Sequence, residues 1–158
     1  MNEIKFEKIE IKNEVLKKIN IYYAGTEYIT KEDISYSIGI LRVRGNYPWG
    51  SKGSLIGENL RGISTYIREL YILDALLLDL SELEYEWGNN LLGIAQPQTV
   101  DTKKGEDWLG YYIIGSKENK HALETLFLEF GKSSKVKKIY TDLNTALKEI
   151  KSQLELIK

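Results

Sequence analysis

Four carboxylates lie close together in the middle of the chain, at Asp79, Glu82, Glu84 and Glu86. Paired carboxylates can act as general acid and general base, or they can bind a hard cation such as Mg²⁺. The sequence shows no second acidic cluster and no basic group placed to orient a substrate. The pattern therefore favours a solvated acidic loop, whose charge would steer a basic partner. Acid-base catalysis by Asp79, Glu84 or Glu86 is the alternative.

The chain has a single histidine, His121, and no cysteine. A zinc site needs several histidine or cysteine ligands, so we expect neither a metal nor another cofactor. A Ser-His-Asp triad would have to use His121, but no Gly-x-Ser-x-Gly motif is present to display a serine nucleophile. We therefore expect no catalytic residue, with an enzyme that uses His121 and the carboxylates as the alternative.

The stretch Gly45 to Lys52 nearly matches a phosphate-binding loop between a strand and a helix. A working loop needs Lys and then Ser or Thr directly after its last glycine. Here Ser51 precedes Lys52, and the bulky residues at 47–49 would crowd a phosphate. We interpret the stretch as a turn between strand and helix, in which Trp49 can contact a partner.

A second aromatic loop follows the acidic cluster and contains Trp87, Gly88, Asn89 and Asn90. Either asparagine would cap a helix, whose free N–H groups suit a carboxylate or a phosphate. Gly88 would let a partner approach the backbone, and tryptophan is enriched in binding hot spots. Alternatively, Trp87 packs into the core and the asparagines only cap the helix. The predicted partner-binding residues are Trp49, Glu84, Glu86, Trp87, Gly88, Asn89 and Asn90.

These residues must be positioned by a fold that mixes strands and helices. Alternating or continuous apolar residues predict strands at 4–11, 19–23 (closed by Ala24 and Gly25), 34–45, 74–80, 108–114 and 136–140. Apolar residues spaced three and four apart predict helices over 60–70, 91–95, 122–130 and 143–157. The apolar run 74–80 suits a strand covered on both faces, which implies a parallel sheet. We therefore expect the α/β class, with an open mixed sheet and crossover helices.

Three segments of this predicted fold resemble the STAS domain of the anti-sigma-factor antagonist family. Residues 41–45 resemble the strand and glycine that lead into the family's first helix. Residues 74–85 resemble its central strand and the loop after it, and residues 143–147 resemble its last helix. The resemblance runs over 34–158 and implies one STAS-like domain, to which 1–33 adds an N-terminal β-rich extension.

The loop after the central strand is where regulatory members of this family differ from the present sequence. Those members carry Asp followed by Ser or Thr there, and the hydroxyl is phosphorylated. In our matching Gly88 stands at the hydroxyl position and Trp87 at that of the acid. The resemblance therefore implies a non-catalytic regulatory module that binds a protein or a small ligand at this loop, without phosphorylation of residue 88.

Composition limits the classes of partner. The 158 residues carry a net charge of −1 without a basic stripe, which argues against nucleic-acid binding. No apolar run approaches the ~18 residues of a membrane helix, and the charged N-terminus lacks a signal-peptide core. We expect a cytoplasmic protein with a protein partner and no membrane insertion.

Two alternatives concern the kind of partner. The chain would also suit an immunity or antitoxin protein that masks the active site of a toxin. The edge formed by residues 4–11 would allow a homodimer, or it would complete the sheet within one chain.

Overall fold

The computed structural model describes residues 3–95, 109–131 and 136–157. In chain order the elements are β1 (Glu7–Ile9), η1 (Glu14–Leu16), β2 (Ile19–Ile29), β3 (Ser35–Asn46), η2 (Gly50–Gly53), α1 (Ser54–Leu70), β4 (Ala75–Asp79), β5 (Leu83–Glu84), η3 (Asn89–Ala95), β6 (Gly110–Ile114), α2 (Lys120–Glu124), η5 (Thr125–Phe130), β7 (Ile139–Tyr140) and α3 (Leu143–Leu154). The first three η elements are 3-10 helices, and η5 is a π-helix that continues α2.

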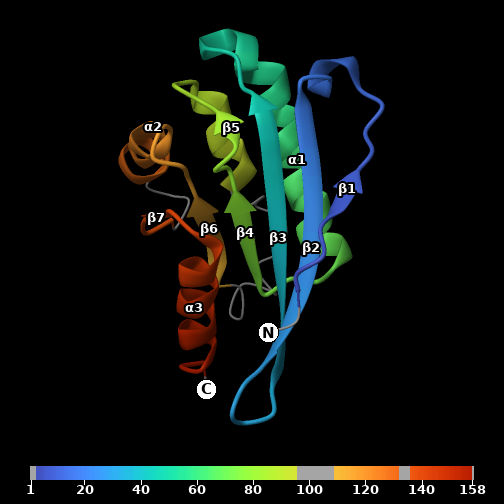
Figure 1. The fold of residues 1–158 in the computed structure, drawn as a ribbon, viewed down its shortest axis with the longest axis vertical. Helices are drawn as coiled ribbons and strands as arrows, with labels where there is room; N and C mark the ends of the chain where they lie inside the picture. Colours follow the sequence, from blue (N-terminus) through green and yellow to red (C-terminus); the bar gives the residue numbers. More distant parts are fainter. Residues whose placement is uncertain (1–2, 96–108, 132–135, 158) are drawn as a thin grey trace.

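The strands form one mixed sheet (Figure 1). Its order is β1-β2-β3-β4-β6-β7, and the two-residue strand β5 pairs with the end of β3. β1, β2 and β3 run antiparallel, whereas β3, β4, β6 and β7 run parallel. Parallel neighbours require crossover connections, and α1 provides the one from β3 to β4. The predicted fold class, α/β with an open mixed sheet and crossover helices, is confirmed.

Helices cover both faces of the parallel half of the sheet. α1, η3, α2 and η5 pack on one face, and α3 packs on the other (Figure 1). Leu76 and Leu78 of β4 point to the α1 face, while Ala75 and Leu77 point to the α3 face. β4 is therefore buried along its whole length, as its continuous apolar run predicts.

The N-terminal segment completes the sheet within the chain, because β1 pairs with β2 and β2 pairs with β3. The prediction that the second strand closes at Gly25 is wrong, since β2 continues to Ile29. Gly25 lies opposite Gly39, and a Cβ at Gly39 would come within 2.4 Å of Leu73 Cδ1. Small residues here let the long hairpin lie against its neighbours, so Gly25 does not end the strand. Dimerisation through the edge strand β1 stays a prediction.

Several predicted elements differ from those observed. The predicted strand at 4–11 is reduced to β1, and the predicted helix at 60–70 begins earlier, at Ser54. The predicted helix at 91–95 is the 3-10 helix η3, held against α1 by the Ser64 hydroxyl, which donates to the Ile94 carbonyl at 2.7 Å. The predicted helix at 122–130 changes from α2 to the π-helix η5 at Thr125. The predicted strand at 136–140 is reduced to β7, and Trp108 lies outside the described residues. None of the described helices is both long and apolar enough to cross a membrane.

Candidate functional site

The loops that follow β3, β4 and β6 meet at the carboxyl edge of the sheet, at the top of Figure 1. Open α/β sheets commonly bind ligands outside the carboxyl ends of their strands. The hollow at this edge has a volume of about 440 Å³. Its lining residues are Asn46, Tyr47, Trp49, Ser81, Glu82, Leu83, Glu84, Tyr85, Glu86, Ser116, Glu118 and Asn119. The fold therefore brings the predicted residues Trp49, Glu84 and Glu86 into one hollow.

Two buried tyrosines hold the loops after β3 and β4 together. The rings of Tyr47 and Tyr85 meet edge to face, with centroids 5.6 Å apart. The Tyr47 hydroxyl donates to the Gly53 carbonyl at 2.9 Å, and the Tyr85 hydroxyl donates to the Gly88 carbonyl at 3.3 Å. Burial raises the pKa of Tyr47, and it raises the pKa of Tyr85 to about 12. Both hydroxyls therefore stay protonated donors at neutral pH.

Two glycines with positive φ let aromatic rings lie directly on the backbone. Gly50 has φ of 57°, and a Cβ there would lie 2.6 Å from Trp87 Cη2. Gly88 has φ of 145°, and a Cβ there would lie 3.1 Å from Tyr47 Cε1. Only glycine accommodates both the backbone conformation and the ring contact at these positions.

Trp49 and Trp87 both lie at the surface beside Gly50. Trp49 precedes Gly50 in the chain and is 58% exposed, whereas Trp87 packs on Gly50 and is 57% exposed. The alternative in which Trp87 packs into the core is therefore wrong. Both indoles are therefore exposed, and the contact with Gly50 positions that of Trp87. Trp49 lines the hollow, whereas Trp87 does not.

A buried asparagine ties the third loop to the second. Asn119, which is 2% exposed, donates through Nδ2 to the carbonyls of Leu80 and Leu83, each at 2.8 Å. Its Oδ1 accepts from the Ser116 backbone N–H at 2.8 Å. Sequence reasoning missed this residue. The signal was Ser116 directly after a strand and its glycine, with asparagine three residues later, a spacing typical of side-chain to backbone hydrogen bonding.

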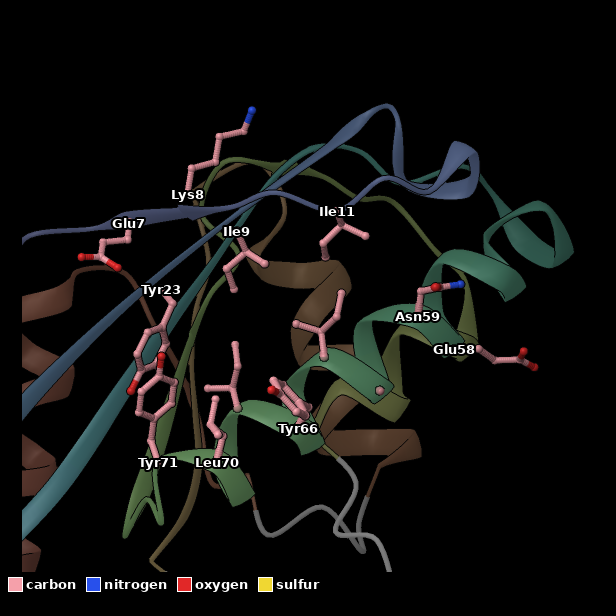
Figure 2. A pocket seen from close by; sticks show the side chains of 13 residues that line it. Glu7, Lys8, Ile9, Ile11, Tyr23, Glu58, Asn59, Tyr66, Leu70 and Tyr71 are labelled. Atoms are coloured by element: carbon pink, nitrogen blue, oxygen red, sulfur yellow. The ribbon is translucent and has the colours of Figure 1, made fainter.

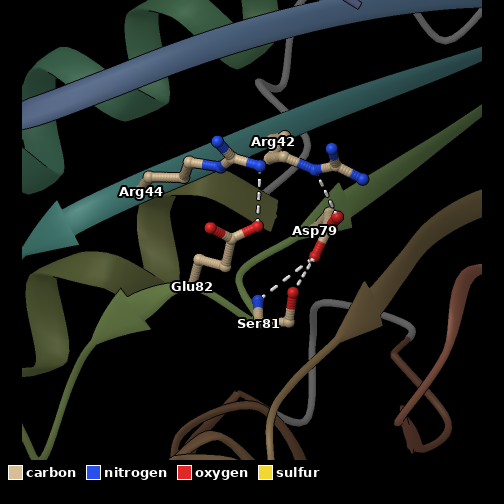
Figure 3. Close-up of polar contacts among 5 residues, drawn as sticks. All are labelled: Arg42, Arg44, Asp79, Ser81 and Glu82. Carbon is tan, nitrogen blue, oxygen red and sulfur yellow. Dashed lines mark hydrogen bonds and ion pairs between the residues drawn. The ribbon is translucent and has the colours of Figure 1, made fainter.

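The acid at the end of β4 is part of a structural network (Figure 3). The Asp79 carboxylate accepts from Arg42 Nε at 2.7 Å, and from Ser81 Oγ and N at 2.6 and 3.2 Å. The Arg42 guanidinium also lies over the Phe6 ring, 3.9 Å from its centroid. Because Asp79 is buried and its two oxygens are already bonded, it is poorly placed to act on a substrate.

The other carboxylates of the cluster differ in whether they form ion pairs or hydrogen bonds. Glu82 forms an ion pair with Arg44 at 2.8 Å, and Glu84 accepts from Asn46 Nδ2 at 2.9 Å. Glu86 is exposed and forms no ion pair within the described residues. Hydrogen bonds from its own backbone N–H and from Ser116 lower the pKa of Glu118, which lines the same hollow. The glutamates that line the hollow therefore give it a negative charge at neutral pH.

The predicted helix N-terminus after the central strand takes a different form. β5 follows β4, and the next helix is the seven-residue 3-10 helix η3, which begins at Asn89. Asn89 and Asn90 are both exposed, and Asn90 also donates through Nδ2 to Ser54 Oγ at 2.8 Å. A short 3-10 helix beside several carboxylates does not favour a carboxylate or phosphate ligand.

The residues considered for catalysis or metal binding are not brought together. His121 is exposed on α2 and does not line the hollow. Within the described ranges no group of three or more His, Asp or Glu side chains is placed to hold a metal ion. The Gly45 to Lys52 stretch forms the turn into α1, with the Tyr47 ring packed against Gly53 where a phosphate would need space.

Comparison with solved structures found similar chains, one of which is described here. No protein-family model matches the chain, and no curated protein matches it. The structure is similar to the crystal structure of an anti-sigma factor antagonist from Mycobacterium paratuberculosis, with 15% identity and a TM-score of 0.46, over 81% of this chain and 93% of that one.

Proposed function

We propose that this chain is a non-catalytic binding module that recognises a protein partner at the carboxyl edge of its sheet. We call the contact region the indole surface, and it comprises Trp49, Glu84, Glu86, Trp87, Asn89 and Asn90. Gly88, which the sequence also offered as a contact, is buried against Tyr47 and would support this surface from beneath. The observation that carries the proposal is the exposed pair of indoles, each more than half accessible, on loops fixed by buried contacts.

The energetics of such a surface favour binding. An exposed indole gains stabilisation only when another surface covers it, and tryptophan is among the residues most enriched in hot spots. The buried tyrosines and Asn119 hold the loops in place before a partner arrives. Association then immobilises few additional groups, so less conformational entropy opposes binding.

The charge of the surface indicates the kind of partner. Glu86 lacks an ion pair in the described part of the chain, and Glu84 and Glu118 line the same hollow. Complementary charge accelerates association and disfavours partners of the same sign. The proposed partner therefore presents basic side chains around an apolar centre that covers Trp87.

Control by phosphorylation at the loop position is not part of the proposal. Gly88 has no hydroxyl, and its positive φ and close contact with Tyr47 disfavour any larger residue there. Partner exchange would have to depend on concentration or on a competing protein.

The acidic rim favours one second candidate. Enzymes that cleave nucleic acids bind phosphates with basic side chains, and an acidic surface with aromatic groups can cover such a site. An immunity or antitoxin role would use the same indole surface, and the identity of the captured partner separates the two functions.

The first test is capture of partners from a native lysate with wild-type chain and with Trp87→Ala. Phe130→Ala is the matched control, because Phe130 is an aromatic residue that is 65% exposed and lies on η5, outside the indole surface. A partner identified by mass spectrometry is then titrated against each purified form. Trp87→Ala is expected to cost about 2 kcal/mol or more of binding, with Phe130→Ala near wild type. If folded Trp87→Ala binds as well as wild type, the indole surface is not the contact region.

A further inference from the structure

A second hollow lies between the N-terminal strand and α1. It shares no lining residue with the hollow at the carboxyl edge of the sheet. Its volume is about 660 Å³. Small-molecule sites typically measure roughly 300–1,000 Å³. β1 and Ile11 border one side, α1 borders the other, and Tyr23 of β2 lies toward one end (Figure 2). We refer to this space as the β1–α1 groove.

The groove is lined mostly by apolar and aromatic side chains. Ile9, Ile11 and Ile63 line its inner part, where they pack against the core. Tyr66 and Leu70 of α1 also line it and are 64% and 54% exposed. Large side chains on one helix face that remain this open indicate a surface that an apolar ligand would cover.

Two tyrosines lie stacked face to face at one end of the groove. The rings of Tyr23 and Tyr71 stack with centroids 4.5 Å apart and planes 14° from parallel. Burial raises the pKa of Tyr23 to about 12, so its hydroxyl is neutral at physiological pH. Each ring covers one face of the other, so a planar ligand ring would extend the stack on an outer face, with the hydroxyls as hydrogen-bonding groups.

A glycine in the middle of α1 lines the groove without a packing reason from the fold. A Cβ on Gly62 would have no heavy atom within 4 Å. Glycine weakens a helix interior relative to alanine, so folding alone favours a larger residue at this position. Glycine is favoured where a ligand approaches the backbone closely, and Gly62 places such a point within the groove.

The charges at the rim favour a cation. Glu7 lies next to the tyrosine pair and Glu58 lies at the other end of the groove (Figure 2). Neither forms an ion pair within the described residues. Lys8, the one basic residue of the lining, pairs with Glu10 at 3.3 Å. An ammonium group beside Glu7 would therefore meet uncompensated negative charge and aromatic rings, which both attract it.

We propose that the β1–α1 groove binds an alkylamine that carries a planar aromatic ring. The ring lies against the Tyr23–Tyr71 pair, and the ammonium group lies beside Glu7. The ring would cover Tyr66 and Leu70 and pass close to Gly62. This site is separate from the indole surface, so its occupancy and partner binding can be measured independently.

The test uses three probes with one ring system and different charge at neutral pH: 1-pyrenemethylamine, 1-pyrenemethanol and 1-pyreneacetic acid. Each is titrated against the full chain and followed by pyrene fluorescence. The ammonium probe is expected to bind saturably and at least about tenfold more tightly than the carboxylate probe. Glu7→Gln should weaken only the ammonium probe, while Glu32→Gln, in the exposed turn between β2 and β3, should change neither.

Position 62 provides the steric test. Gly62→Leu should fill the groove and weaken the ammonium probe at least about tenfold, without loss of thermal stability, because a side chain has space there. Gly62→Ala should strengthen the helix similarly but reduce binding much less, which separates blocking from helix stability.

Three outcomes would overturn the proposal. They are absence of saturable binding of the ammonium probe, equal binding of all three probes, and unchanged binding in folded Gly62→Leu. Sedimentation supplies a fourth: if the chain self-associates and Gly62→Leu abolishes this, the groove is a contact between two copies.

Discussion

The indole of Trp87 lies on the backbone of Gly50, so close that a Cβ at position 50 would be 2.6 Å from Trp87 Cη2. Gly50 also has φ of 57°, a conformation that other residues adopt at a cost. The exposed position of Trp87 therefore depends on a glycine in the loop after β3, 37 residues earlier in the chain. The proposed partner recognition at the indole surface would depend on the same contact.

Gly50→Ala is expected to destabilise the chain by about 1–2 kcal/mol and to displace Trp87, because the methyl group is strained and collides with the indole. Urea unfolding measures the first effect, and fluorine NMR of 5-fluorotryptophan-labelled protein measures the second. Gly62→Ala is the control, since its methyl group meets open space in a helix and should stabilise by up to about 1 kcal/mol. An unchanged Trp87 signal in Gly50→Ala would show that this contact does not position the indole.

Asn119→Ala is expected to destabilise the chain by about 2–3 kcal/mol, because the carbonyls of Leu80 and Leu83 lose a buried donor. Chemical denaturation gives the free energy of unfolding. Asn144→Ala, on the exposed surface of α3, should stay within about 0.5 kcal/mol of wild type. If both variants have similar stability, Asn119 does not hold the loops together.

Glu86→Gln is expected to slow association with a basic partner at low salt by about twofold or more and to leave dissociation nearly unchanged. The reason is that exposed charge accelerates encounter more than it stabilises the complex. Stopped-flow or surface-binding kinetics at several salt concentrations would show the difference shrinking as salt increases. Glu32→Gln, in the turn between β2 and β3 at the opposite end of β3, should have no effect, and an equal effect would refute local steering.

Stability should fall at alkaline pH. Burial raises the pKa of several tyrosines to about 12, namely Tyr23, Tyr85, Tyr112 and Tyr140. An unfolded tyrosine ionises near pH 10, so between about pH 10 and 12 the unfolded state releases protons that the folded state keeps. Their contribution to stability is full below pH 10 and decreases as pH rises through this window.

Urea unfolding between pH 9 and 11.5 would measure this decrease, and Tyr85→Phe should make it shallower because one of the groups is removed. Tyr66→Phe serves as the comparison, since Tyr66 is exposed on α1. A slope in Tyr85→Phe equal to that of wild type would contradict the argument.

Much of the fold could be predicted from local pattern. The continuous apolar run at 74–80 became the central buried strand β4, and the spacing after Asp142 became α3, with Asp142 accepting from the Thr145 N–H at 2.8 Å. Both signals depend on residues near in sequence. The end of β2, the two-residue strand β5 and the π-helix η5 depend on pairing and packing with distant residues, so local pattern could not define them.

For the candidate site, too, some features could be predicted from the sequence and others depend on the tertiary structure. The sequence by itself identified the residue types of the indole surface, because tryptophan, glycine and clustered acids are chemically distinctive wherever the chain places them. Only the tertiary structure decided that Trp87 is exposed, that Asp79 is bound to Arg42, and that Asn119 joins two loops. The burial of these side chains and their hydrogen-bond partners depend on segments that lie tens of residues apart in the chain. The crossover topology brings those segments to one edge of the sheet.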